Sequence, residues 1–426
     1  MPRRRAGREA RAIDANAIRN RVDFRRRSGR AEPHAAGSDP TSSAGRARLR
    51  ASLNTMTKDE LAAWANDPKR RDTLPYGLFE PPYQKGIVGA AFVVRGVLYF
   101  RNGYTDAKRK ALVRCYDRYL DAITKYEVAL AKAEGRDEPK SGPMRWFYAE
   151  GEAPVAFDKS PGFPDLAKRL PSNAALVSTT TSADHKLATG FYDFSVFCLE
   201  DWEAKFGRSL DVMSFTVPRS FLQLAPGAFE RLFAEFADGL RPVHGHGGYA
   251  VNLPPMGRDP NEASEYFWAR QYGAGLDVGS PRRTCVRDLT DKLKTVDWLT
   301  AIDSDLVRAV GGADALMLPP DWYRKTPFGD GGLIIQAGTE PQTGVAMGAG
   351  QPPALPAAYV LLNKALHAIV ADTIDSLQDG TVSSTAPLLS TTVASEAWLR
   401  RFNVPDDELP GYWIELHKTA KLPAVQ

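Results

Sequence analysis

Residues 226–253 read PGAFERLFAEFADGLRPVHGHGGYAVNL, and this stretch decides the fold class. Its first half spaces apolar side chains three or four residues apart, as on one face of a helix, and Pro226 suits the first turn. These side chains are Phe229, Leu232, Phe233, Phe236 and Leu240. The second half predicts a Gly-rich turn over 244–248 and a strand over 249–253. A helix with one apolar face has to bury that face, here against a sheet, so the stretch predicts an α+β fold.

The residues before this stretch predict a strand, a long helix and a series of short strands. Residues 86–100 alternate apolar and polar side chains with the period of a half-buried strand. Apolar residues then recur at helical spacing from Asp106 onward, and Gly135 suits the end of that helix. Short runs separated by turn residues follow, which is typical of an antiparallel meander. These predicted strands cover 144–149, 175–181, 190–199 and 211–217.

The residues after 253 predict further helices and one strand. The helices are expected near 261–272, over 291–310 and over 357–374, and the strand over 333–336. Gly311 and Gly312 suit the end of the second helix. Each half of the chain would therefore hold a sheet with at least one long covering helix.

The charge pattern and these elements divide the chain into three predicted parts. Residues 1–50 hold 14 Lys and Arg against 5 Asp and Glu, which leaves 41 basic and 46 acidic residues in the rest. We interpret residues 1–55 as a disordered basic extension, and our hypothesis is that Met56 is the natural start, with the preceding residues absent from the natural product. The remainder predicts two fused lobes of mostly antiparallel sheet covered by amphipathic helices, over 56–222 and 223–426.

The cysteines and the apolar runs indicate in which cellular compartment the protein is expected. Cys115, Cys198 and Cys285 lie too far apart for a disulfide framework or for the close pairs of a zinc site, so we expect reduced, buried thiols. The N-terminal arginines are followed by polar sequence rather than by the apolar core of a secretion signal. No run has the length of a membrane span. The expectation is a cytoplasmic protein without a membrane partner.

The sequence HGHGG at 244–248 is the strongest candidate for chemistry. Two imidazoles two residues apart at a strand end face the same side, and His244 and His246 are therefore a candidate metal pair, with Asp259 or Glu262 as third ligand. We favour a structural role, because glycines between a helix and a strand supply unusual backbone angles and the remaining histidines lack matching spacing. A metal-dependent enzyme using His244 and His246 is the alternative.

Other motifs of catalysis or cofactor binding are not found. The Gly-rich stretches 329–332 and 344–350 lack the order of a phosphate-binding loop, and are expected to be loops. Ser195 lies in the middle of a predicted strand, and the pair Asp303 and Asp305 is typical of solvated surface. No catalytic residue, metal or cofactor is predicted. The basic tail offers a second alternative, a nucleic-acid-binding protein, but it lacks the interleaved aromatics that grip single strands, so no specific nucleic acid is predicted.

The order of these segments resembles the type VI secretion immunity family (TsiV-like), once a domain of unknown function. The resemblance covers about residues 86–402 and excludes 1–55. In the first half it rests on VLYF at 97–100, MRWFY at 144–148, FSVF at 194–197 and SFTVP at 214–218. In the second half it rests on the helix 229–240, HGHGGY at 244–249, GLDV at 275–278, VDWLT at 296–300, GGLIIQAG at 331–338 and WLRRF at 398–402.

The resemblance implies an immunity protein rather than an enzyme. Family members are bacterial, are encoded beside toxic effectors, some of them VRR-Nuc-type nucleases, and neutralise the toxin inside the producing cell. The implied partner is therefore a cognate effector toxin, bound so that its active or substrate-binding surface is occluded. A nuclease is basic where it faces DNA, so we predict an acidic partner-binding patch at Asp406, Asp407 and Glu408. The sequence leaves the oligomeric state open.

Overall fold

A computed structural model describes residues 73–75, 87–256, 262, 265, 269, 273–344, 354–378 and 392–424. All of these belong to the unit over Met56–Gln426. The predicted basic extension over 1–55 lies outside the described residues, as do Asp259 and most of the predicted loop over 344–350. None of the helices in the described ranges combines the length and the apolar character of a membrane-spanning segment.

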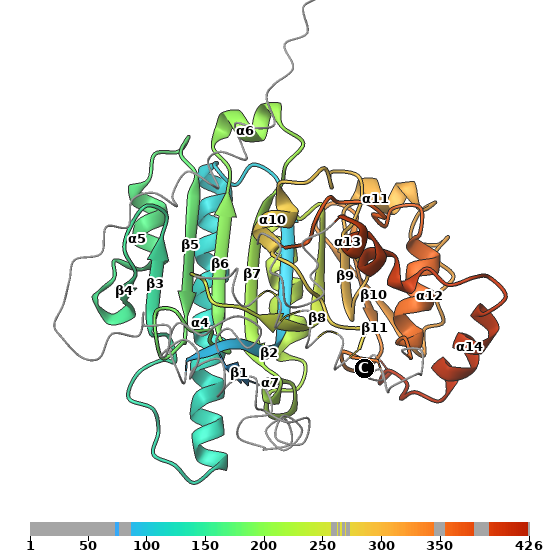
Figure 1. Cartoon of the computed structure of the whole chain (residues 1–426), viewed down its shortest axis with the longest axis horizontal. Coiled ribbons are helices and arrows are strands. Elements are labelled where there is room, and N and C mark those ends of the chain that lie inside the picture. The colour runs from blue at the N-terminus through green and yellow to red at the C-terminus, as the bar shows by residue number, and fades with distance from the viewer. Residues whose placement is uncertain are drawn as a thin grey trace, which may run out of the picture. The chain divides into compact units, whose positions relative to one another are not determined.

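One continuous antiparallel sheet organises this unit (Figure 1). It has 11 strands in the order β10-β11-β9-β8-β2-β7-β6-β5-β3-β4, with β1 paired to β2. The strands of the first half are β1 (Thr73–Pro75), β2 (Val88–Phe100), β3 (Trp146–Ala149), β4 (Val155–Ala156), β5 (Leu176–Thr181), β6 (Asp193–Cys198) and β7 (Asp211–Pro218). Those of the second half are β8 (His244–Asn252), β9 (Leu299–Ile302), β10 (Tyr323–Phe328) and β11 (Gly332–Ala337). The predicted α+β class and the antiparallel meander β3-β5-β6-β7 are confirmed.

Helices cover both faces of the sheet, as Figure 1 shows, with α4 behind it and α10 and α13 in front. The longer ones are α4 (Asp106–Ala133), α5 (Gly162–Arg169), α8 (Ala228–Leu240), α12 (Ala357–Leu366), α13 (Thr392–Leu399) and α14 (Leu409–His417). The shorter ones are α6 (Asp201–Phe206), α7 (Ser220–Leu224), α10 (Pro281–Cys285), α11 (Ser304–Ala309) and the 3-10 turns η2 (Phe157–Lys159) and η4 (Arg400–Phe402). The helix α4 begins and ends where the sequence predicts, with Thr105 capping its first turn.

The face of the sheet under α4 and α8 is an aromatic core. Phe215 of β7 lies between the two helices, with its ring 6.0 Å from Tyr119 of α4 and 5.0 Å from Phe236 of α8. The apolar stripe predicted for α8 is buried in full, although the helix begins at Ala228, after Gly227 at φ 70°, rather than at Pro226. This packing fixes the two longest helices on one side of the strand pair β2 and β8.

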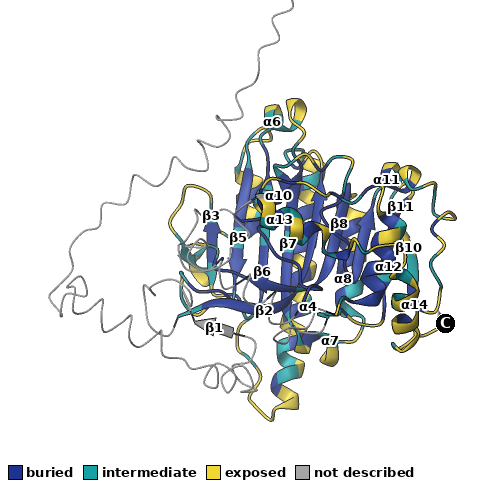
Figure 2. Cartoon of the chain, turned by 45° about the vertical axis from the view of Figure 1, so that its right-hand side comes forward, coloured by how far each residue is buried: buried dark blue, intermediate teal, exposed yellow. Residues whose placement is uncertain are grey.

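The strand β2 is buried on both faces, and the prediction of a half-buried strand is wrong (Figure 2). It lies between β7 and β8, so strands of both halves of the sequence pair with it. The polar residues of its alternating pattern, Arg95 and Tyr99, are 3% and 0% exposed because the chain around Asp277 covers that face. The sheet therefore runs unbroken from the first half of the sequence to the second, and the boundary between residues 222 and 223 stays a prediction.

Three further predictions are wrong. The residues 244–248 form part of the strand β8 and not a turn. The residues 291–310 hold the strand β9 and the short helix α11, because residues 299–302 pair with both β8 and β11 and the Asp303 side chain caps α11. The helix predicted over 357–374 ends at Leu366, and the chain then runs back so that Val370 pairs with Leu293.

Candidate functional site

The candidate ligands His244 and His246 lie inside β8, on the side opposite α8. His244 pairs with Tyr99 of β2 and His246 with Val97, and paired residues of an antiparallel sheet share a face. Both imidazoles therefore point to the same side, as expected for neighbours two residues apart. They are 0% and 1% exposed, so solvent does not reach either ring.

The glycines between and after these histidines admit side chains from elsewhere in the fold. A side chain at Gly247 would lie 3.3 Å from the rings of Phe229 and Phe233, and one at Gly248 would lie 2.0 Å from the carboxylate of Asp297. The two contacts come from opposite faces of the sheet. The HGHGG motif is thus part of a strand that side chains approach closely from both faces of the sheet. Glycine leaves room for them, so these glycines have a structural role.

His246 is held by a buried cluster of charged side chains that is centred on Asp277. Its Nε2 donates to Asp277 Oδ2 at 2.9 Å, and Arg95 donates to the same oxygen at 2.7 Å. Lys294 Nζ donates to Asp277 Oδ1 at 2.5 Å. All four side chains are 3% exposed or less. We call His246, Arg95, Asp277 and Lys294 the Asp277 cluster.

The protonation states in the Asp277 cluster follow from burial and from these contacts. Burial alone would raise the pKa of Asp277, but Lys294, His246 and Arg95 outweigh it and hold this pKa well below its usual range. Burial lowers the pKa of His246, with Lys294 and Arg95 acting in the same direction and Asp277 against it. The cluster therefore holds an ionised carboxylate between two cations, with a neutral imidazole beside it.

This arrangement is unfavourable for a metal ion at the two histidines. A metal there would lie close to the charges of Arg95 and Lys294, and His246 already gives its Nε2–H to a carboxylate. Burial, with His246 and Lys294, lowers the pKa of His244 to about 3, and its ring lies 4.6 Å from that of Tyr99. Among the residues that the structure describes, no three His, Cys, Asp or Glu side chains are grouped to hold a metal.

The other residues considered from sequence are placed as follows. The hydroxyls of Ser195 and Thr179 hydrogen-bond across β5 and β6 at 2.8 Å. Asp303 caps α11, and Asp305 pairs with Arg308 on the surface. The three cysteines are buried, and burial raises the pKa of Cys115 to about 12. The stretch 329–332 contains the turn between β10 and β11.

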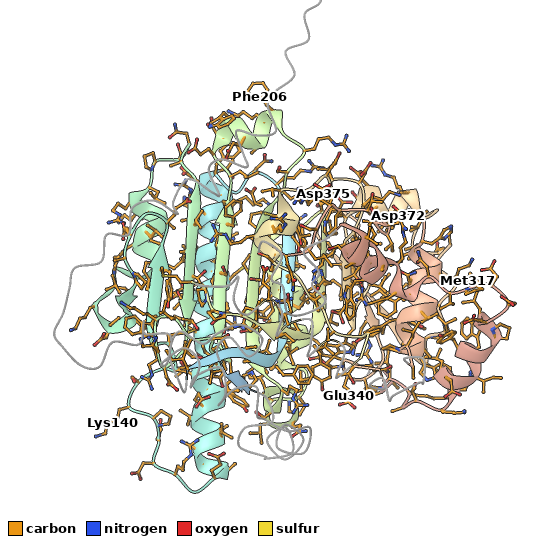
Figure 3. All side chains as sticks on the ribbon, viewed as in Figure 1. Lys140, Phe206, Met317, Glu340, Asp372 and Asp375 are labelled. Atoms are coloured by element: carbon orange, nitrogen blue, oxygen red, sulfur yellow. The ribbon has the colours of Figure 1, made fainter. Side chains whose placement is uncertain are left out.

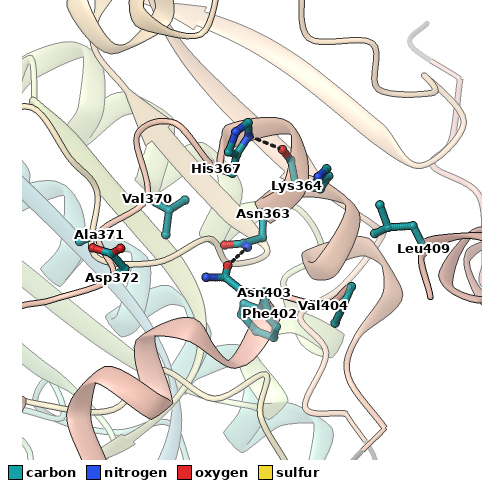
Figure 4. Close-up of a pocket in the computed structure, with 10 residues that line it drawn as sticks. All are labelled: Asn363, Lys364, His367, Val370, Ala371, Asp372, Phe402, Asn403, Val404 and Leu409. Atoms are coloured by element: carbon teal, nitrogen blue, oxygen red, sulfur yellow. Dashed lines mark hydrogen bonds between the residues drawn. The ribbon is translucent and has the colours of Figure 1, made fainter. Parts of the chain in front are cut away.

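The predicted acidic patch lies in the exposed turn before α14. Asp406, Asp407 and Glu408 are all exposed, and Asp406 pairs with Lys364 of α12 at 2.6 Å. Lys364 and Leu409, the residue after Glu408, line a hollow of about 320 Å³ at the end of α12 (Figure 4). The side chain of Asn363 donates to Asn403 Oδ1 across this hollow at 2.7 Å. The patch is therefore accessible and adjoins a surface hollow.

A second hollow, of about 570 Å³, lies along α14 and is mainly apolar in its residues. Trp413 and His417 line it from the helix, and Lys325, Asp314 and residues 316–320 line the rest of it. Met317 is 85% exposed, Ile414 is 61% and Trp413 is 36%. We call Met317, Trp413, Ile414 and this hollow the α14 surface. Exposed aromatic side chains also occur on α6, where Trp202 is 48% and Phe206 79% exposed.

Sequence reasoning missed two of these features. In the Asp277 cluster, Arg95 and His246 lie 182 and 31 positions before Asp277 in the sequence. Asp277 entered the sequence analysis only as part of GLDV, one of the stretches that carry the family resemblance. The α14 surface also escaped prediction, since no helix was expected after residue 374. The run from Leu409 to His417, with Pro410 in its first turn, is the signal that would have identified it.

Comparisons with known proteins agree with the resemblance found in the sequence. The family model TsiV, described as type VI immunity for VRR-NUC, matches residues 111–402. Among solved structures, the Pseudomonas aeruginosa T6SS protein PA0821 aligns with a TM-score of 0.74 and 29% sequence identity, over 86% of this chain and 97% of that one. No curated protein matches the chain.

Proposed function

This chain belongs to the TsiV family of type VI immunity proteins, and we propose that it neutralises a VRR-Nuc-type nuclease by binding it and covering the surface that meets DNA. The observation that carries the proposal is the match to the family model, which runs from α4 to η4 and so includes the strands β3 to β11. The similarity to the T6SS protein PA0821 supports it, since it spans nearly all of that protein.

The Asp277 cluster supports inhibition by binding rather than by catalysis. A catalytic group has to touch its substrate, and the imidazoles of His244 and His246 are buried inside the sheet. His246 is also committed to a carboxylate that two cations hold. The burial of both histidines argues against the metal-dependent alternative. The nucleic-acid alternative depends on residues 1–55, which lie outside the described residues.

The acidic patch at Asp406, Asp407 and Glu408 is our proposed point of electrostatic contact. A nuclease is positively charged where it holds the phosphates of DNA, and exposed carboxylates attract such a surface. All three residues are exposed on one turn. A stable complex buries about 1,200–2,000 Å² in total, so the patch would be one part of a larger interface.

We place this action in the cytoplasm of the producing cell, because a nuclease that enters the cell attacks the DNA there. The toxin would be the effector encoded beside this chain, and one copy of this protein would block one copy of the toxin.

Co-expression tests the proposal. A test strain that expresses the neighbouring effector should stop growing, and co-expression of this chain should restore growth and give a complex that co-purifies. A His244→Leu and His246→Leu double variant that folds should protect equally well, because neither ring contacts the toxin. If the strain stays inhibited while both proteins are made and the effector is active, the proposed function is wrong.

A further inference from the structure

The α14 surface exposes more apolar side chain than the packing of the helix requires. On one side of α14, Leu416 is fully buried. Ile414 lies on the opposite side and is 61% exposed. Trp413, three residues before Leu416 and so on the same side as it, is 36% exposed and lines the hollow together with Met317. Exposed apolar groups that share one hollow are typical of a partner site, whereas scattered single ones are not.

The residues of this surface have the composition of an interface centre. Met and Trp are enriched at the centres of interfaces, and Trp is among the commonest residues that dominate binding energy. The hollow of about 570 Å³ is larger than any single side chain, so it has room for apolar side chains of a partner. Its base is fixed, because Lys325 Nζ donates to the carbonyl oxygens of Ala313 and Leu316 at 2.8 Å.

The charges beside the α14 surface indicate what kind of partner it receives. The acidic patch directly precedes the helix, and Lys364 pairs with Asp406 alone. Within the described parts of the chain, Asp407 and Glu408 take part in no ion pair. The positive charges further along are paired, Lys418 with Glu415 and Lys421 with Asp321. One end of the apolar surface is therefore negatively charged, which matches a basic segment of a partner.

The helix α14 follows the range that the family model matches. The family model ends at residue 402, and both the acidic patch and α14 follow it. Met317, across the hollow from the helix, lies inside the matched range, so the α14 surface combines a part that the family model covers with a part that it does not.

We propose that the α14 surface is the anchor site for the nuclease, and that it receives apolar side chains from a segment of the toxin that also carries Lys or Arg. The apolar side chains fill the hollow between Met317 and Trp413, and the basic ones lie against Asp407 and Glu408. The inference rests on the proposed function, because it takes its partner from it.

Substitution of Met317 tests the anchor. Met317 is 85% exposed, so Met317→Glu leaves the folded chain intact while it places a charge in the hollow. An added negative charge would strengthen attraction to a basic toxin if charge alone mattered. Weaker binding would therefore be due to the apolar contact. We expect the dissociation constant for the purified, catalytically inactive neighbouring effector to rise about 30-fold or more, the range of an interface hot spot.

Phe206→Glu is the matched control. Phe206 is 79% exposed on α6, and Figure 3 shows it well apart from Met317. In Figure 1, α6 lies at the top of the middle strands, whereas α14 lies at the right-hand side of the picture. The control adds the same charge to an equally exposed apolar site and should bind like the unaltered protein. Trp413→Ala, checked for folding by its thermal midpoint, should weaken binding to a similar extent as Met317→Glu.

The outcomes separate this inference from the proposed function. If the unaltered protein does not bind the effector, the proposed function fails and the inference with it. If the unaltered protein binds, and Met317→Glu and Trp413→Ala bind equally well, the toxin docks elsewhere and the inference alone is wrong. Loss of binding in Phe206→Glu with retention in the other two would assign the anchor to α6.

Discussion

His246 donates a hydrogen bond from Nε2 to the carboxylate of Asp277 at 2.9 Å, deep between the sheet and the segment that covers it. The contact joins β8 to residue 277, which also pairs with Ala250 of the same strand. His246, a candidate metal ligand in the sequence, therefore helps to hold the central strands to the segment that covers them. The cluster around Asp277 is thus a structural centre, and its removal should affect stability first.

Asp277→Ala should destabilise the protein by about 3–5 kcal/mol, because it leaves Arg95 and Lys294 buried without their counter-charge. The free energy of unfolding in urea measures the loss. Asp121→Ala is the matched control: Asp121 pairs with Lys125 on the surface of α4 and should contribute at most about 1 kcal/mol. Equal stability of the two variants would show that the cluster does not hold the fold.

His244→Leu should flatten the acid side of the stability profile. An unfolded histidine binds its proton near pH 6.5, whereas burial first, and then His246 and Lys294, lower the pKa of His244 to about 3 in the folded state. Between these values the unfolded chain binds the extra proton, so stability is lost as the pH falls from about 6.5 toward 3.

The measurement is the free energy of unfolding at pH 7, 5.5 and 4.5. The unaltered protein should lose up to about 1.4 kcal/mol more per pH unit than the leucine variant across this window. At pH 7 the ring is largely neutral in both the folded and the unfolded chain, so a difference there reflects the packing of the ring and not its protonation. A variant with the same acid slope as the unaltered protein would contradict a buried, neutral His244.

Gly96→Ala should destabilise the chain by about 1–3 kcal/mol through overpacking. A Cβ on Gly96 of β2 would lie 2.4 Å from the ring of Phe215, which is fixed between α4 and α8. Gly239→Ala is the control, because a Cβ there meets nothing within 4 Å and alanine favours the helix α8. Thermal midpoints should move down for the first variant and up or not at all for the second, and a reverse order would contradict the packing described.

Reversal of the acidic patch should slow the encounter with the toxin. In a variant with Asp406, Asp407 and Glu408 all changed to Lys, the association rate should fall about tenfold or more at low salt, with less effect on dissociation. The difference should shrink as salt is added, since screening weakens attraction between exposed charges. Stopped-flow mixing with the inactive effector measures both rates. Full protection of cells and an unchanged association rate would remove the patch from the interface.

The helices and strands that were predicted correctly are those whose own residues carry the pattern of apolar side chains. The predictions of α4 and α8 are confirmed because each helix buries the apolar face that its own sequence pattern marks. The second half of β8 was predicted as a strand, but residues 244–248 were predicted as a turn because their glycines are typical of one. The reason for these glycines lies far away in the chain. Phe233 and Asp297 approach the strand from its two faces, and neither contact is visible in neighbouring sequence.

The candidate sites also differ in whether neighbouring residues of the sequence reveal them. The acidic patch was visible because three carboxylates adjoin in sequence, and its role in binding stays a prediction. The Asp277 cluster was not visible, since Arg95 reads as the solvent side of an alternating strand until Asp277, 182 residues later, covers it. In the sequence, Met317 cannot be distinguished from a methionine of the core, and only the structure shows that it is exposed beside α14.

The most direct test is a titration of nuclease activity. The purified neighbouring effector is mixed with increasing amounts of this protein, and the cleavage of DNA is measured after equilibration. Inhibition by binding predicts a linear fall in activity that reaches its end when the two proteins are equimolar, with the effector recovered intact from the complex. Full inhibition by a small fraction of an equivalent, or no inhibition at a large excess, would contradict it.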